Sequence, residues 1–235
     1  MREENPESIV SASFIDDFHP SVSLSGNWVL FAEAQNEGGS SQSQRLMRVP
    51  LAGGHPEVVL TGHLEGQGCA HSPATLCVLA ERTPDQKQLV FSSFDPVNGR
   101  GKELTRMDVD SITRYEWEPS PDGSRIAIHK VTEAPIQIIS LAGQATKQVT
   151  AAGWNSIENL HWAADGKGFY SASRTVDSSV LLYIDLQGNV RRVWEQKGTL
   201  GNESAGTSGI PSPDGRHIAM MGYVQSANMW MLEDF

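Results

Sequence analysis

The residues best suited to covalent chemistry are the two cysteines, Cys69 and Cys77, in the stretch CAHSPATLC. They lie symmetrically about Pro73, and residues equidistant from the centre of a hairpin can face each other across its strands. Their Cα atoms can then come within the range of about 4.4–6.8 Å that a disulfide needs. Two interpretations stay open. One is a disulfide, which would indicate an oxidising compartment, and the other is a pair of buried thiols that pack as small apolar side chains.

Other chemical motifs are incomplete in this sequence. The stretch GTSGI at 206–210 is one residue short of a Gly-x-Ser-x-Gly nucleophile motif, and its composition favours a loop between blades. The stretch DPVNGRGKE at 95–103 resembles a calcium loop, but Val97 stands where a carboxylate or amide is required, which favours a turn. No histidine shows metal-site spacing, and no phosphate-binding, dinucleotide or kinase motif occurs. We therefore expect no catalytic residue, no metal site and no cofactor.

Charge and hydropathy narrow the possible partners. The chain has 235 residues and a formal net charge of −10, with scattered basic residues. Nucleic-acid binding needs clustered Lys and Arg, so we expect no nucleic-acid partner for this domain. No apolar run approaches the roughly 20 residues of a membrane span, so we expect no membrane insertion. The polar start REENPES resembles the interior of a longer protein. We expect one domain over 1–235, cut from a larger multidomain chain.

A four-residue turn motif recurs along the whole chain. Its third positions are residues 25, 74, 122, 165 and 214, so successive copies are 49, 48, 43 and 49 residues apart. In the best copies, Ser-Pro-Asp-Gly, proline presets φ for a type I turn and glycine accepts the positive φ that follows. Such turns close β-hairpins. The spacing therefore predicts five similar β-units.

Each unit reads as four strands. A short apolar run follows each turn, such as SRIAIHK at 124–130, and is typical of a strand buried on both faces. A second run and a charged outer run follow, such as KELTRM at 102–107. Four-stranded antiparallel units repeated radially form a β-propeller. We expect a closed five-bladed ring in which ESIVSASF at 7–14 completes the blade that ends with NMWMLEDF at 228–235. The alternative is an arc of a larger propeller with six to eight blades.

Together with the repeats, several stretches carry a family resemblance: LMRVPLAGG at 46–54, SPDGSRIAI at 120–128 and VLLYIDLQGNVRRVWEQKG at 180–198. The repeats resemble the PD40 units of TolB-type six-bladed propellers, which are related to WD40-like repeats. The whole looks like the carboxy-terminal propellers of acidobacterial regulators, where the propeller follows a serine/threonine kinase or a winged-helix domain. The resemblance implies a sensor or interaction module without a catalytic site. It also implies an extracytoplasmic location if the chain is fused to a membrane-spanning kinase, and a cytoplasmic one otherwise.

A ligand of a propeller is expected at one mouth, where the connections between blades meet the loops between second and third strands. Those segments hold acidic, aromatic and amide groups, which suit a protein, a peptide or a small polar ligand. Trp154 could instead wedge between blades. The mouth candidates are Asp16, Asp17, Tyr115, Trp154, Arg174, Asp177 and Tyr223. We expect a non-catalytic sensor or scaffold serving a fused kinase or DNA-binding domain. The alternative is a propeller hydrolase or lactonase with a central metal.

Overall fold

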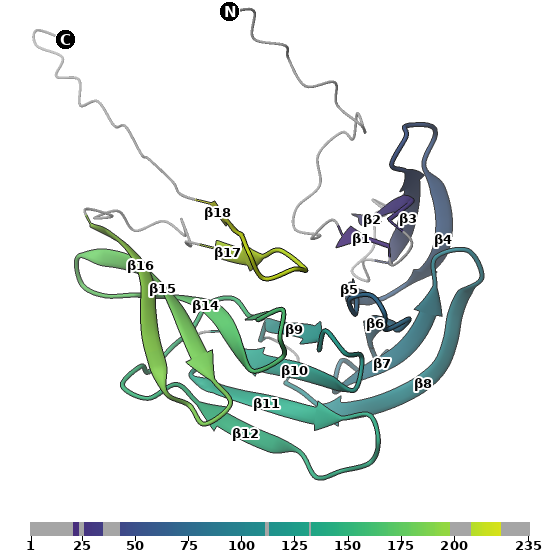
Figure 1. Cartoon of the computed structure of the whole chain (residues 1–235). Coiled ribbons are helices and arrows are strands. Elements are labelled where there is room, and N and C mark those ends of the chain that lie inside the picture. The colour runs from purple at the N-terminus through teal and green to yellow at the C-terminus, as the bar shows by residue number, and fades with distance from the viewer. Residues whose placement is uncertain are drawn as a thin grey trace, which may run out of the picture. The chain divides into compact units, whose positions relative to one another are not determined.

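The computed structural model describes residues 21–23, 26–34, 43–110, 113–131, 133–197 and 208–221 (Figure 1). These residues build antiparallel β-sheets, and none of them lies in a helix. The described ranges accordingly offer no helix that could cross a membrane. The chain divides into two compact units, one of residues 1–130 and 136–148, the other of residues 131–135 and 149–235.

Three four-stranded sheets make up most of the first unit, each with its strands in sequence order. The first sheet contains β1 (Ser21–Val22), β2 (Trp28–Ala34), β3 (Gln44–Pro50) and β4 (Glu57–Gly62). The second contains β5 (Leu64–Cys69), β6 (Cys77–Arg82), β7 (Gln88–Asp95) and β8 (Gly99–Asp108). The third contains β9 (Tyr115–Pro119), β10 (Arg125–Lys130), β11 (Pro135–Ser140) and β12 (Lys147–Thr150).

The recurring turn closes the hairpin between the first two strands of a blade. In the third sheet, Asp122 Oδ1 accepts hydrogen bonds from Ser120 Oγ at 2.5 Å and from the Ser124 backbone N–H at 3.0 Å. Gly123 has φ 69° and donates its N–H to the Ser120 carbonyl at 2.8 Å. Aspartate thus satisfies the turn's donors, while glycine takes the left-handed conformation. The repeated motif is therefore a local hairpin signal.

Strand β6 is buried on both faces because neighbouring blades pack against it. Along β6, Cys77 and Leu79 join one core cluster, which includes Leu30 of β2. Val78 and Ala80 point the other way and join a cluster with residues of β10. Both faces of the strand therefore need apolar residues, which explains a continuous apolar run instead of strict alternation.

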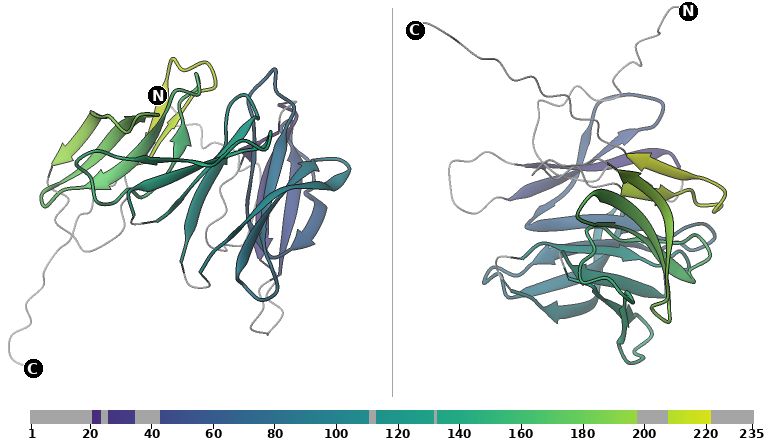
Figure 2. Two further views of the ribbon diagram at one scale, coloured as in Figure 1. Left: turned by 90° about the horizontal axis from the view of Figure 1, so that it is seen from below. Right: turned by 90° about the vertical axis from the view of Figure 1, so that its left-hand side faces the viewer.

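The second unit holds a four-stranded sheet and a hairpin. The sheet contains β13 (His161–Trp162), β14 (Gly168–Arg174), β15 (Ser178–Asp185) and β16 (Val190–Lys197), and the hairpin contains β17 (Ser208–Pro211) and β18 (Ile218–Met221). Figure 2 shows the hairpin, in yellow, beside the green sheet, and β17 contacts β14. A Cβ atom on Gly209 would lie 2.6 Å from Leu181 Cδ2, so glycine permits this close packing.

The prediction of an all-β propeller with four-stranded antiparallel blades is confirmed. Two strands of the fifth unit are described. Residues 7–14 and 228–235 lie outside the described residues, so the closed five-bladed ring stays a prediction.

One local prediction is wrong, and another is confirmed. Ser208–Ile210, expected to lie in a loop between blades, belong to strand β17 and pair with β18. The small residues that suggest a loop instead allow β17 to approach Leu181 closely. The stretch 95–103 does turn, because Asp95 Oδ1 accepts hydrogen bonds from the backbone N–H groups of Val97 and Asn98, both at 2.8 Å.

The cysteine pair lies where the two strands of the second blade's first hairpin face each other. Cys69 and Cys77 are directly opposed in the β5–β6 register, with their Cα atoms 4.0 Å apart, slightly closer than the expected range. Their Sγ atoms form a disulfide, so of the two open interpretations the structure has the bonded one. Cys77 is 1% exposed and belongs to the core cluster between the first two blades.

Candidate functional site

Two predicted mouth residues come together at one end of the fourth blade. Arg174 ends β14, and its Nε lies 2.7 Å from Glu158 Oε1 in an ion pair. Asp177 lies in the following loop and accepts a hydrogen bond from Thr175 Oγ1 at 3.1 Å. This is a loop between the second and third strands of a blade, as expected.

The other mouth candidates lie elsewhere or outside the described residues. Tyr115 begins β9 in the first unit and packs against the core cluster between the second and third blades. Trp154 lies against the outer strand β16, with its ring centroid 5.4 Å from Arg192 Cζ. Arg192 pairs with Leu182, three residues along β15 from Ser179, the partner of Arg174. Ser156, two residues after Trp154, accepts a hydrogen bond at 2.8 Å from the hydroxyl of Ser173, the neighbour of Arg174. Outside the described residues are Asp16, Asp17 and Tyr223.

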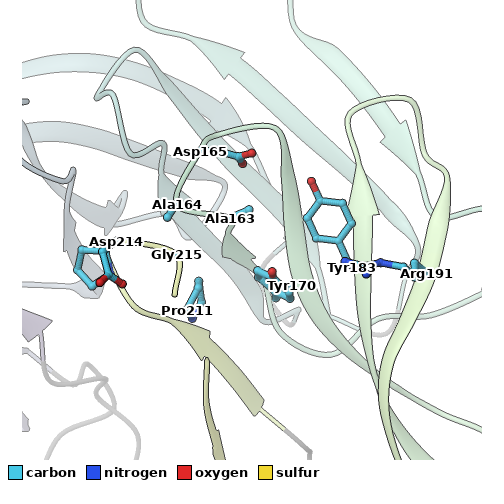
Figure 3. A pocket seen from close by; sticks show the side chains of 10 residues that line it. Ala163, Ala164, Asp165, Tyr170, Tyr183, Arg191, Pro211, Asp214 and Gly215 are labelled. Carbon is cyan, nitrogen blue, oxygen red and sulfur yellow. The ribbon is translucent and has the colours of Figure 1, made fainter. Parts of the chain in front are cut away.

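A pocket that sequence reasoning missed lies at the opposite end of the fourth blade (Figure 3). It has a volume of about 510 Å³. The turn that leads into β14 and the turn between β17 and β18 form part of its wall. Its lining residues are Ala163, Ala164, Asp165, Tyr170, Tyr183, Arg191, Pro211, Pro213, Asp214 and Gly215. We call this pocket the tyrosine groove.

A row of three side chains crosses the strands of the groove. Tyr170 of β14 pairs directly with Tyr183 of β15, which pairs with Arg191 of β16. The two tyrosine ring centroids are 5.4 Å apart in an edge-on arrangement. Arg191 Cζ lies 5.6 Å from the Tyr183 ring centroid. Opposed residues share one face of a sheet, so the register brings three residues from three strands onto one surface.

The Tyr183 ring is positioned by a glycine on the neighbouring strand. A Cβ atom on Gly168 would lie 2.7 Å from both Cζ and the hydroxyl oxygen of Tyr183. It would also lie 2.5 Å from the Ile184 carbonyl oxygen. Position 168 therefore needs glycine because the ring and the adjacent strand occupy the space of a side chain.

Tyr170 breaks the pattern of the second and third blades. The first residue pair after the β13–β14 turn is Trp162 with Phe169, and Tyr170 is the next residue along β14. The same position holds Val78 in the second blade and Ala127 in the third, and both are 0% exposed. Tyr170 is instead half-buried. This departure from the repeat is the signal by which sequence comparison between blades could have found the groove.

Two carboxylates and one arginine are among the residues that line the groove. Asp165 and Asp214 are exposed residues of the two turns. Burial is the main cause that raises the pKa of the Tyr183 hydroxyl, and the charges of Asp165 and Asp185 raise it further. Arg191 acts in the opposite direction. The groove thus combines two aromatic rings with two carboxylates and one arginine, and Asp214 also pairs with Arg216, whose Nε lies 3.9 Å from Asp214 Oδ2. Such a lining suits hydrogen bonding and cation binding.

Comparison with known proteins identifies the fold. No family model and no curated protein matches the sequence. The chain is similar to the crystal structure of TolB from Acinetobacter baumannii, with TM-score 0.62 and 17% identity over 86% of this chain and 49% of that one. It is also similar to a structure described as putative TolB from Agrobacterium tumefaciens, with TM-score 0.58 and 18% identity over 87% of this chain and 69% of that one.

A hydrolase structure shares the same fold. Puromycin hydrolase, as an S511A mutant in complex with PGG, matches with TM-score 0.51 and 17% identity over 84% of this chain and 32% of that one. The chain spans about half the length of the TolB structure from Acinetobacter baumannii. At these identities the similarity establishes the fold, and the fold does not fix the function. The chain described here therefore has a TolB-like β-propeller fold.

Proposed function

We propose that this chain is a non-catalytic binding module that holds a polypeptide partner on behalf of a fused effector domain. The tyrosine groove is its recognition surface. The carrying observation is the row of Tyr170, Tyr183 and Arg191, in which Tyr170 stands where the second and third blades bury Val78 and Ala127. Tyrosine and arginine are the residue types that most often dominate the energy of protein interfaces.

The size and stiffness of the groove support a polypeptide ligand. Its volume of about 510 Å³ is large enough for one or two side chains. Its rings lie on strands of one sheet, and the Tyr183 ring occupies the space next to Gly168. A rigid surface loses little conformational entropy when it binds, so more of the contact energy appears as affinity.

The effector domain lies outside this chain in the proposal. A kinase or a winged-helix DNA-binding domain is the effector that the family resemblance implies. The Cys69–Cys77 disulfide fits an oxidising compartment. An extracytoplasmic propeller that reports to a membrane-spanning kinase is therefore the arrangement we favour.

The test is selection of binders from a displayed library of random dodecapeptides, using the purified chain. Synthetic copies of selected peptides are then titrated by fluorescence anisotropy. We expect Tyr170→Leu and Tyr183→Leu each to weaken binding by about tenfold or more, because buried tyrosines act as hot spots. The exposed Val97→Ser in the first unit is the control and should leave the Kd unchanged.

A second set of variants separates the groove from the predicted mouth. Arg174→Gln with Asp177→Asn removes the mouth charges at the other end of the same blade. If this double variant abolishes peptide binding while the groove variants do not, the mouth is the site and the groove assignment is wrong. Circular dichroism and thermal unfolding of every variant show whether lost binding reflects lost folding.

Because puromycin hydrolase has the same fold, an assay for hydrolysis tests directly whether this chain lacks catalytic activity. The purified chain should show no turnover of ester, lactone or peptide substrates, with or without divalent metal ions. Turnover that a chelator abolishes would contradict the proposal and favour a propeller hydrolase or lactonase.

A further inference from the structure

We infer that the tyrosine groove takes a basic side chain, arginine or lysine, of its partner polypeptide, an inference that rests on the function proposed above. Aromatic faces attract cations that lie within about 6 Å of the ring centroid. The groove already contains one such contact, between the Arg191 guanidinium and the Tyr183 ring at 5.6 Å. Tyr170 is the neighbouring ring in the same row, on the side away from Arg191.

Two carboxylates line the groove beside the tyrosine pair. Asp165 lies in the turn that leads into β14, and Asp214 lies in the turn between β17 and β18. Asp214 makes a long, exposed ion pair with Arg216 at 3.9 Å, whereas Asp165 is the charge that acts most on Tyr183. The two turns touch, since a Cβ atom on Gly215 would lie 3.3 Å from Ala164 Cβ. Figure 3 shows Asp214 and Arg191 on opposite sides of the tyrosine pair. A cation between Tyr170 and these turns would meet both an aromatic ring and negative charge.

The electrostatic environment favours a cation over an anion. Burial first, and then Asp165, Tyr170 and Asp185, raise the pKa of Tyr183 against the influence of Arg191. The same carboxylates that disfavour a tyrosinate would repel an acidic guest and attract a basic one. The chain's net charge of −10 adds a long-range attraction for basic partners.

The experiment compares which dodecapeptides the wild type and Asp165→Asn select from the displayed library. Asparagine retains an oxygen for the hydrogen bond from the Lys167 N–H at 3.0 Å, so this variant removes charge with little disturbance of the turn. We expect wild-type binders to share an arginine or lysine at one position. Replacing that residue with glutamine should weaken binding by about 3- to 30-fold. The preference should shrink in Asp165→Asn and disappear in Tyr170→Leu.

The salt dependence of peptide binding provides a second measurement of the same interaction. Added salt should weaken binding of the arginine peptide more than that of its glutamine analogue, because exposed charges are screened. Peptides that bind the groove without an enriched basic residue, or with an acidic one, would overturn this inference and leave the proposed function standing. A library that yields no binder would remove the proposed function, and this inference with it.

Discussion

Replacing Gly168 with alanine tests whether this glycine creates the space for Tyr183. The φ of Gly168 is not in the left-handed region, so the backbone itself tolerates alanine. The obstacle is contact, because the new Cβ would lie 2.5 Å from the Ile184 carbonyl oxygen and 2.7 Å from Tyr183 Cζ. Ordinary contact begins at 3.4 Å, so the carbonyl would have to retreat by about 0.9 Å. Such a shift strains the pairing of β14 with β15.

Two opposing effects set the magnitude. Overpacking of this kind costs about 1–3 kcal/mol. Alanine returns about 0.4–1 kcal/mol by restricting the unfolded chain. We therefore expect Gly168→Ala to lower the free energy of unfolding by about 1–2 kcal/mol. Because part of the clash is with the Tyr183 ring, Tyr183→Leu in the same chain should recover about 0.5–1 kcal/mol as a coupling energy.

Urea unfolding of the two single variants and the double variant measures this coupling, with circular dichroism and tryptophan fluorescence as probes. Trp162, which is 2% exposed and stacks near Phe169, lies in the same sheet and is one reporter of its packing. Gly143→Ala is the control, since Gly143 has φ 78° with open space around it. Alanine there should cost about 1–2 kcal/mol through the backbone alone, without coupling to Tyr183. A cost below about 0.5 kcal/mol for Gly168→Ala, or strict additivity with Tyr183→Leu, would refute the assigned role of Gly168.

Two further predictions concern the first unit. Reduction of the Cys69–Cys77 disulfide, which spans a sequence separation of 8, should lower the free energy of unfolding by about 2–3 kcal/mol. The urea midpoint with and without reductant measures this, and a Cys69→Ser, Cys77→Ser variant that still responds to reductant would contradict it. The pKa of Asp110 falls from its usual 3.8 to about 2, first through hydrogen bonding to Thr113 and then through Lys130. This carboxylate therefore stabilises the fold above pH 4 and loses its effect as the pH falls towards 2, so the deficit of Asp110→Asn should vanish there. A deficit that is constant between pH 5 and pH 2 would show that Asp110 acts by some means other than its charge.

The sequence alone was enough to predict the blades, because their signals are local. Asp122 and Gly123 close a hairpin through contacts with residues fewer than five positions away. The opposed pair of Cys69 and Cys77 follows from symmetry about a single turn. A continuous apolar run indicates a strand that is covered on both faces, whichever sheets cover it. The loop predicted at 206–210 was wrong because its small residues serve packing between strands, as where Gly209 lies against Leu181.

The groove, by contrast, was decided by tertiary structure. Tyr170, Tyr183 and Arg191 lie on three different strands, and only the register of β14, β15 and β16 places them in one row. The carboxylates join them because two hairpins of separate repeats touch at Ala164 and Gly215. The spacing of residues along the chain predicts turns and strands. A binding surface depends in addition on which strands pair and which turns come into contact. For that physical reason the propeller was foreseeable from the amino acids, and its candidate binding site was not.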